Sequence, residues 1–238
     1  VKNNLSPAGI AMDVNKGPLE KAQEHIREEK IGGKIATRLG NGLAPLEPGE
    51  TDTVIIAGMG GDLICKILKA KPEFLIEGKE FILQPQSEWF KIRRLLKEYR
   101  YQIEKEWFLK EDGKYYVIIK AEPAWTQPQR LKHQQPSIHE YIKEISDTQV
   151  NQAVSEKDME SIYEQYGKYL IETKNPVLKE YLEKEITKKE SIAAELKQSI
   201  KEIESEELSG KERGNIAKRQ RRYQEIQKEI RDMRKAIG

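Results

Sequence analysis

Two hydrophobic periods alternate along the first half of the chain. Runs of strand-like residues predict strands over 8–14, 34–40, 52–59 and 80–83. Apolar positions three and four apart predict helices over 17–29 and 61–70. Ser87 offers an N-cap for one more helix, whose apolar positions are Phe90, Ile92, Leu95 and Leu96. Such alternation of strands and helices is typical of an open α/β sheet.

The pattern changes after residue 100. Two strand-like runs, 101–109 and 114–122, flank the segment Lys110-Glu-Asp-Gly113, and Asp-Gly is a strong signal for a β-hairpin turn. We therefore expect the sheet to end in an antiparallel pair. Alternating units followed by a terminal hairpin are typical of class I methyltransferase sheets, which are Rossmann-like.

The second half of the chain is predicted to be helical. A Gln-, Pro- and Arg-rich stretch without periodicity, 123–136, reads as a linker. Beyond it, two sets of positions seven residues apart form apolar seams: Leu182, Lys189, Leu196 and Ile203 with Ile186, Ala193 and Ile200, then Ile216, Tyr223, Ile230 and Ile237 with Ile226 and Met233. The segment 205–215 separates the seams. The prediction is an antiparallel helical hairpin, a short coiled coil, with domains at 1–123 and 156–238 and a linker at 124–155.

The strand ends carry the candidate chemistry. In open α/β sheets, ligands bind outside the carboxyl ends of the strands, which here are Ala57-Gly-Met-Gly-Gly61 and Gln84-Pro-Gln86. Glycines at the first corner allow a ligand to approach the backbone closely. The two amides at the second can hold the edge of a base, and a capped turn explains them equally well. No Lys-Ser/Thr follows the glycines, which excludes a Walker phosphate loop.

Two earlier positions are further candidates. Asp13 ends the first strand, where a carboxylate can accept hydrogen bonds from ribose hydroxyls, although an ordinary turn or capping Asp is an equal alternative. Asn41, in the segment 40–43, offers a donor and an acceptor to an adenine edge, whereas Asn-Gly is also a common plain turn. For both residues, the sequence alone does not decide between a ligand-binding role and a turn.

Composition narrows the class of protein. A mean hydropathy of -0.77 with 34% charged residues among 238 is explained by solvated helices. Ten Lys or Arg against four acidic residues in 211–235 can form a nucleic-acid footprint, although a solvated helix face is the commoner reason. A single cysteine, Cys65, and the lack of a long apolar run favour a cytoplasmic protein without a membrane span. Three scattered histidines predict no metal site.

Taken together, these segments resemble the TrmK-type bacterial tRNA (adenine-N1) methyltransferases, which methylate adenine 22 of tRNA with S-adenosylmethionine. The resemblance is carried, in this order, by Ala11-Met-Asp-Val-Asn-Lys-Gly-Pro-Leu19, Gly40-Asn-Gly-Leu43, Ile56-Ala-Gly-Met-Gly-Gly61, Leu83-Gln-Pro-Gln86, Glu111-Asp-Gly-Lys-Tyr-Tyr116 and Tyr166-Gly-Lys-Tyr-Leu170. The family also has an antiparallel helical hairpin after its methyltransferase domain. The stretch 124–155 matches poorly.

The resemblance implies roles for individual residues. The expected cofactor-binding residues are Asp13 and Val14 near the ribose, Asn41, Gly42 and Leu43 beside the adenine, and Ala57, Gly58, Met59 and Gly60 near the methionine moiety. Gln84, Pro85 and Gln86 are expected to face the target base, and Lys218, Arg219, Arg221 and Arg222 to contact tRNA phosphates. The family usually has Asp where Asn41 stands, which predicts weaker adenine binding. No residue is assigned as the catalytic base, and among oligomeric states a monomer is favoured.

The segment before Ala8 is too short to hold the first part of the family pattern. The family's first strand, which lies centrally in its sheet, and an Asp-x-Gly-Ser-Asp-His type loop are expected there, and seven residues precede Ala8. We therefore expect an N-terminally truncated sheet with two unpaired strand edges and a natural protein that extends upstream. The alternative function is a non-catalytic RNA- or protein-binding remnant of such an enzyme.

Overall fold

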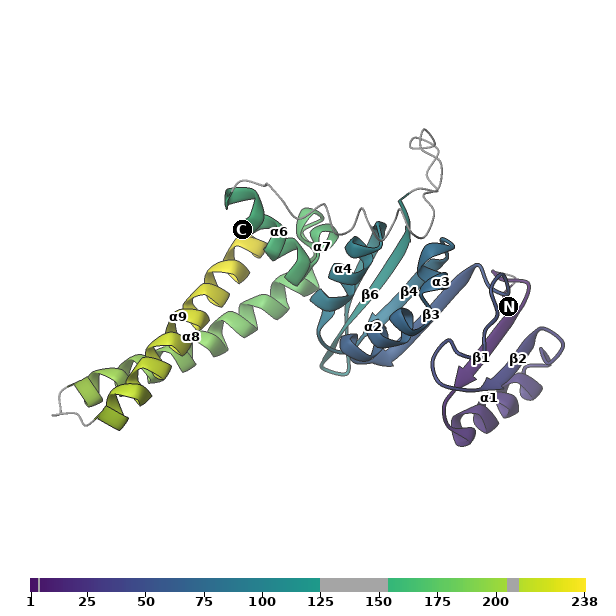
Figure 1. Ribbon diagram of the computed structural model, residues 1–238, viewed down its shortest axis with the longest axis horizontal. Coiled ribbons are helices and arrows are strands. Elements are labelled where there is room, and N and C mark those ends of the chain that lie inside the picture. The colour runs from purple at the N-terminus through teal and green to yellow at the C-terminus, as the bar shows by residue number, and fades with distance from the viewer. Residues whose placement is uncertain (4, 125–153, 205–209) are drawn as a thin grey trace. The chain divides into compact units, whose positions relative to one another are not determined.

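The chain folds into two compact units (Figure 1). The computed structural model describes residues 1–3, 5–124, 154–204 and 210–238. One unit contains Val1–Glu104 and Lys120–Ser146, and the other contains Lys105–Ile119 and Asp147–Gly238. The predicted linker over 124–155 lies almost entirely outside the described residues, and the two units are described separately below.

The first strands of the chain form a parallel pair. Strand β1 (Gly9–Asp13) pairs with β2 (Ile35–Leu39), with Gly9 opposite Ile35 and Asp13 opposite Leu39. Helix α1 (Lys16–Glu28) connects them and contacts both strands, which completes a βαβ unit. The predicted elements 8–14, 17–29 and 34–40 are confirmed to within one residue at each end.

A second sheet holds the strands that follow. Its order is β3-β4-β6-β5, with β3 (Thr53–Met59), β4 (Glu80–Pro85), β5 (Tyr101–Glu111) and β6 (Lys114–Pro123). Helices α2 (Gly61–Ala70), α3 (Pro72–Ile76) and α4 (Trp89–Glu98) lie between its strands in the sequence. Figure 1 shows α2 and α4 together on one face of this sheet. The hairpin is confirmed, and α3 is an element that the hydrophobic pattern did not predict.

Strand β3 is buried on one face only. Val54 and Ile56 are buried, whereas Ile55 between them is 67% exposed. In the described part of the chain one face of β3 is therefore covered and the other is not, although β3 pairs with β4 in parallel. Within the described residues β1 and β2 form a separate sheet and do not pair with β3. That a further strand precedes Ala8 stays a prediction.

The segment after β2 joins the two sheets by packing. Leu43 and Leu46 are buried, and a Cβ on Gly42 would lie 2.8 Å from Cγ2 of Ile67 on α2. At the same carboxyl end of α2, the Lys71 ammonium donates a hydrogen bond to the Leu46 carbonyl over 3.1 Å. The segment 40–46 is thus held against the helix that follows β3.

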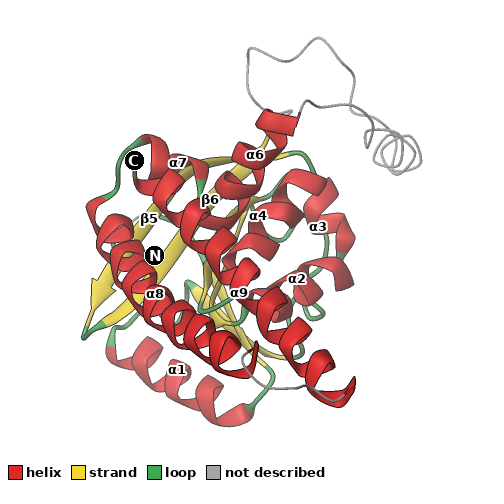
Figure 2. Ribbon diagram, turned by 90° about the vertical axis from the view of Figure 1, so that its left-hand side faces the viewer, coloured by secondary structure: helices red, strands yellow, loops and turns green. Residues whose placement is uncertain are grey.

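The second unit is built on a helical hairpin. Helices α6 (Val154–Tyr166) and α7 (Lys168–Glu172) precede α8 (Pro176–Glu204) and α9 (Gly210–Ile237). The Asn175 side chain starts α8 by accepting hydrogen bonds from the amides of Val177 and Leu178, both over 3.0 Å. Figure 1 and Figure 2 both show α8 and α9 side by side. Because α9 begins at Gly210, the predicted break over 205–215 is too long, and 205–209 lie outside the described residues.

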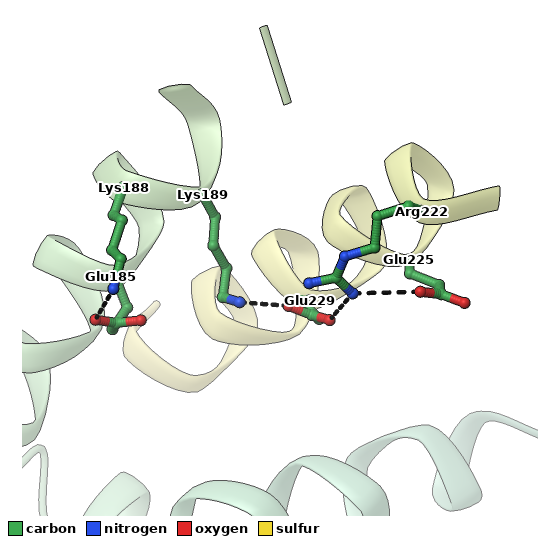
Figure 3. Close-up of polar contacts among 6 residues, drawn as sticks. All are labelled: Glu185, Lys188, Lys189, Arg222, Glu225 and Glu229. Atoms are coloured by element: carbon green, nitrogen blue, oxygen red, sulfur yellow. Dashed lines mark hydrogen bonds and ion pairs between the residues drawn. The ribbon is translucent and has the colours of Figure 1, made fainter. Parts of the chain in front are cut away.

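The predicted seams form the contact between α8 and α9. The buried seam side chains are Leu182, Ile186, Ala193, Ile200, Ile216, Ile226, Ile230 and Met233. Lys189, the one polar residue in the α8 seam, forms an ion pair of 2.5 Å with Glu229 on α9, and Arg222 lies 3.3 Å from the same carboxylate (Figure 3). A charge placed in an apolar seam needs such a partner, so the pair disfavours other registers of the hairpin.

The tip of the β5–β6 hairpin belongs to the helical unit. Phe108 and Tyr115 of the tip contact the Tyr181 ring on α8, with ring centroids 5.5 Å and 5.0 Å apart. The Glu180 carboxylate is 2.6 Å from the Lys110 ammonium and 2.7 Å from the Lys184 ammonium. The compact units therefore divide within β5 and β6, whereas the boundary at residue 123 was predicted from composition.

We expect Glu180→Gln to reduce the acid sensitivity of this unit. Hydrogen bonds from Lys110 and Lys184 lower the pKa of Glu180 to about 2. A carboxyl whose pKa is lowered by folding stabilises the folded state above its unfolded pKa. This stabilisation is lost as the pH falls through the folded value, here between about 4.5 and about 2. Urea unfolding at several pH values across this window should show that the free energy of unfolding falls less steeply with decreasing pH in the variant than in the wild type. The exposed Glu183→Gln is the matched control, and equal slopes for wild type and Glu180→Gln would contradict the expectation.

Candidate functional site

The carboxyl ends of β3 and β4 lie next to each other. The strands are parallel, with Ala57 opposite Gln84 and Met59 opposite Pro85, and the register shifts between these pairs at Gly58. Gly58 has a φ of 78°, a left-handed conformation that favours glycine. The extra residue forms a β-bulge, and β-bulges often change the direction of side chains next to a functional site. The structure thus brings together the two segments that the sequence singled out.

Hydrogen bonds join the two strand-end segments into one unit. The Gly58 amide donates to the Gln84 side-chain oxygen Oε1 over 2.8 Å, and the Gln86 amide donates to the Met59 carbonyl over 2.9 Å. Further along, the Gly61 amide donates to the Ser87 carbonyl over 2.9 Å. Because both backbones are held at several points, the segments cannot move independently.

The glycines of this corner have different roles. A Cβ on Gly61 would lie 2.6 Å from the Glu88 carbonyl oxygen and 2.7 Å from the Ser87 carbonyl oxygen. A Cβ on Gly60 would lie 3.2 Å from the Ser87 hydroxyl. The nearest atom to a Cβ on Gly58 would be Nε2 of Gln86, 4.0 Å away. Gly61 is therefore explained by packing of the chain on itself. Of the three, Gly58 is the one whose surroundings leave room for a ligand.

Gln84 and Gln86 differ in their surroundings. Gln84 is half-buried, and within the described residues its amide nitrogen Nε2 is buried without a hydrogen-bond partner. Gln86 is exposed, Pro85 between them is buried, and Ala57 on the neighbouring strand is exposed. A buried amide without a partner costs stability, so its retention calls for an explanation.

A charged cluster fixes the start of α4 against α2. Glu88 has a φ of 53° and occupies the N-cap position that was expected for Ser87, so that expectation is wrong. Its carboxylate accepts a hydrogen bond from the Asp62 amide over 3.3 Å and pairs with Lys91 over 2.5 Å. Hydrogen bonds to Glu88 and Asp62 raise the pKa of Lys91. Glu88 could not be predicted from the sequence, because its left-handed conformation is visible only in the backbone.

The ends of β1 and β2 form a second group of candidates. Asp13 Oδ1 accepts a hydrogen bond from the Asn15 amide over 2.8 Å, while the Gly40 amide donates to the Asp13 carbonyl over 3.0 Å. Asp13 therefore does form the turn that was the alternative prediction. A carboxylate has about four acceptor positions, so this turn leaves capacity for a ligand. Val14 and Asn41 are exposed beside it.

Packing explains the neighbouring Gly42 and Leu43. Gly42 has a φ of 56° and faces Ile67, and the Leu43 side chain is 3% exposed. The Leu43 side chain lies in the core, so only the backbone here is available to a ligand. The two groups of candidates lie on separate sheets and are linked through α2, which begins at Gly61 and carries Ile67.

The four basic candidates lie on α9, in the helical unit. Arg219 donates a hydrogen bond to the Ser199 hydroxyl over 2.6 Å, and Arg222 pairs with Glu225 and Glu229 (Figure 3). Arg219 therefore joins α9 to α8, whereas Arg222 pairs within α9, in part with the Glu229 carboxylate that also binds Lys189 of α8. Lys218 and Arg221 are exposed, although Arg221 also lies 3.4 Å from Glu225.

The family model and the related proteins that match this chain are all described as tRNA methyltransferases. Residues 1–165 match the family model described as TrmK: tRNA (adenine(22)-N(1))-methyltransferase. The tRNA (adenine(22)-N(1))-methyltransferase of Bacillus subtilis (strain 168) is 32% identical, and the alignment covers 63% of this chain and 76% of that protein. A putative tRNA methyltransferase of Mycoplasma pneumoniae is 28% identical, with coverage of 63% and 68%.

Solved structures share the fold over the whole chain. An uncharacterized protein from Listeria monocytogenes serotype 4b has a TM-score of 0.72 at 25% identity and covers 100% of this chain and 86% of its own. The B. subtilis tRNA methyltransferase TrmK has a TM-score of 0.65 at 24% identity, with coverage of 97% and 82%. M. capricolum TrmK, solved with S-adenosyl-homocysteine, has a TM-score of 0.64 at 22% identity, with coverage of 100% and 83%.

Proposed function

The chain belongs to the tRNA (adenine(22)-N(1))-methyltransferase family, and we propose that it transfers the methyl group of S-adenosylmethionine to N1 of adenine 22 in tRNA. The observation that carries this proposal beyond family membership is the joined pair of strand ends. They place Gly58, with room beside it, next to the Gln84 amide at the carboxyl edge of a parallel pair.

The residues present fit the ribose and adenine ends of the cofactor. Asp13 keeps acceptor capacity for ribose hydroxyls after forming its turn, and the exposed Asn41 lies beside it on the neighbouring strand end. Gly58 would allow the cofactor to lie close to the backbone at the end of β3. S-adenosylmethionine, when bound, supplies a methyl group on a positively charged sulfur.

The substrate side of the site needs positioning more than acid–base chemistry. N1 of adenine carries a lone pair, so the chain must hold the base with this atom in line with the methyl group. A stacked or paired adenine must first be turned out of the RNA. Gln84 and Gln86 provide amides for holding its edge, and Pro85 stiffens the segment between them. No residue is assigned as the base that removes the proton.

The helical hairpin provides the RNA contact in this proposal. Lys218 and Arg221 are exposed on α9, where they would meet phosphates, while Arg219 bonds to α8 and Arg222 pairs with acidic residues of α9. A tRNA substrate also supports a cytoplasmic location. Among the described helices, none has the combined length and apolarity needed to cross a membrane.

We expect Asp13→Asn to weaken binding of S-adenosylmethionine by about tenfold. Asparagine can keep the turn to Asn15 but presents one acceptor oxygen in place of two charged ones, and hydrogen bonds to charged groups are worth about 1.5–3 kcal/mol. Isothermal titration calorimetry measures the change. Asp52→Asn, an exposed aspartate just before β3, is the matched control. Equal weakening by both variants would argue against a role for Asp13.

Methylation of tRNA tests the reaction itself. Incubation with tRNA and S-adenosylmethionine, followed by mass spectrometry of the digested RNA, should find the methyl group on N1 of adenine 22. A tRNA with guanine at this position should stay unmodified. Binding of tRNA without binding of S-adenosylmethionine would instead support the non-catalytic remnant.

A further inference from the structure

The Gln84 side chain has a fixed orientation. Its oxygen Oε1 accepts the hydrogen bond from the Gly58 amide over 2.8 Å, and Gly58 belongs to the bulge at the end of β3. If the side-chain amide were turned over, its NH₂ group would face the N–H of Gly58, and two donors would be opposed. The oxygen therefore stays on the side of Gly58, and the nitrogen occupies the other position of the planar amide.

The nitrogen of this amide lacks a partner in the described part of the chain. Nε2 of Gln84 is buried without a hydrogen bond, although it has two hydrogens to donate. Oε1 has two lone pairs, of which the Gly58 amide uses one. The side chain thus offers one acceptor position and at least one donor, side by side and in a known order.

We propose that Gln84 determines the specificity for adenine by binding its Hoogsteen edge. Nε2 donates to N7 of the base, and the second lone pair of Oε1 accepts from the N6 amino group, the pairing by which Gln and Asn recognise adenine. This inference rests on the proposed function and deepens it. N1 takes no part in the pairing, so its lone pair remains directed at the methyl group.

The fixed orientation also explains rejection of guanine. Guanine presents the acceptor O6 where adenine presents the N6 amino group, so O6 would face Oε1 of Gln84. A glutamine able to rotate could adapt by exchanging its two ends, whereas the Gly58 amide prevents this exchange. Entry of the base requires movement of whatever covers Nε2. The side chain of Gln86, whose Nε2 lies 4.0 Å from the position of a Cβ on Gly58, belongs to an exposed residue beside this pair.

Methylation of a tRNA that carries 7-deaza-adenine at position 22 tests the pairing. This base keeps N1 and the N6 amino group but has no acceptor at position 7. We expect the wild-type protein to lose about tenfold or more in kcat/KM on this tRNA relative to the unmodified one. Gln84→Leu should be slow on both tRNAs and distinguish them by less than twofold. Gln102→Leu, which changes an exposed glutamine on β5, should keep the wild-type discrimination.

Equal rates of the wild-type protein on the two tRNAs would overturn the role of Gln84. Loss of methylation on both tRNAs would count against the proposed function instead, so a second measurement is independent of turnover. In protein labelled with ¹⁵N-glutamine, the side-chain signal of Gln84, assigned by its loss in Gln84→Leu, should shift on addition of adenosine and not of 7-deazaadenosine. A signal that responds equally to both nucleosides, or to neither, contradicts the inference.

Discussion

Gly61→Ala should lower the free energy of unfolding of this protein by about 3 kcal/mol, near the upper end of what overpacking a close-packed site costs. The added Cβ would lie 2.6 Å and 2.7 Å from the carbonyl oxygens of Glu88 and Ser87, which are backbone atoms and cannot rotate away. Moving the Ser87 carbonyl would break its hydrogen bond with the Gly61 amide and shift the start of α4. Urea unfolding followed by circular dichroism gives the difference directly.

Gly33→Ala is the matched control for this substitution. Nothing lies within 4 Å of a Cβ on Gly33, and its φ is not in the left-handed region. We expect this variant to be unchanged or more stable by up to about 1 kcal/mol, because alanine restricts the unfolded chain. If Gly61→Ala and Gly33→Ala had the same free energy of unfolding, the backbone at Ser87 and Glu88 would have to move to accept the added methyl group at little cost. That result would contradict the prediction.

The Gly61 contact shows how far the glycine-rich segment could be interpreted from the sequence. Three glycines at a strand-to-helix corner predicted that a ligand approaches the backbone closely, whereas the atoms close to Gly61 belong to the chain itself. Whether those atoms belong to a ligand or to the chain depends on the Ser87–Glu88 segment, which is 26 residues away from Gly61 and adopts a left-handed turn. Hydrophobic periodicity contains no information about such a turn, so the roles of Gly58 and Gly61 could be separated only in three dimensions.

Predictions from periodicity were reliable where a single face of an element is buried. Eight of the predicted seam residues of α8 and α9 are buried, because a repeat of seven specifies which side chains meet a partner helix. Leu196, Tyr223 and Ile237 are half-buried, and the side chain of Ile203 lies outside the described part of the chain. The partner of Lys189 was not predictable, since Glu229 lies 40 positions further on and its carboxylate is one of several on α9. Long-range ion pairs of this kind depend on the register of packing, which the sequence alone leaves open.

The same limit applies to an ion-pair cluster around strand β6 of the second sheet. Lys120 on β6 lies 3.0 Å from Glu80, 2.8 Å from Glu104 and 3.0 Å from Glu122, and its hydrogen bonds to these carboxylates raise its pKa. Three strands contribute to this cluster, so it follows from the strand order β4-β6-β5. The sequence predicted each strand but not which strand lies between the other two.

Reversing the charge of Lys218 and Arg221, two of the exposed basic residues on α9, should have the largest effect on RNA binding. We expect the double variant Lys218→Glu/Arg221→Glu to bind tRNA roughly 20-fold or more weakly near 0.15 M salt. Each phosphate contact releases a counterion, so the slope of log affinity against log salt should also fall in magnitude by about 2. Fluorescence anisotropy with labelled tRNA over a series of salt concentrations measures both quantities.

The control is a double reversal on α8 with the same change in net charge, Lys179→Glu/Lys188→Glu. Both lysines are exposed, at 60% and 69% of their side-chain surface, and lie 3.9 Å and 4.0 Å from acidic neighbours on their own helix. A general electrostatic effect would weaken binding equally in the two double variants. A bound RNA at Lys218 and Arg221 would instead reduce the slope in that variant alone. If neither variant changes the slope, the basic residues of α9 serve to solvate the hairpin, and tRNA must be held by the methyltransferase unit.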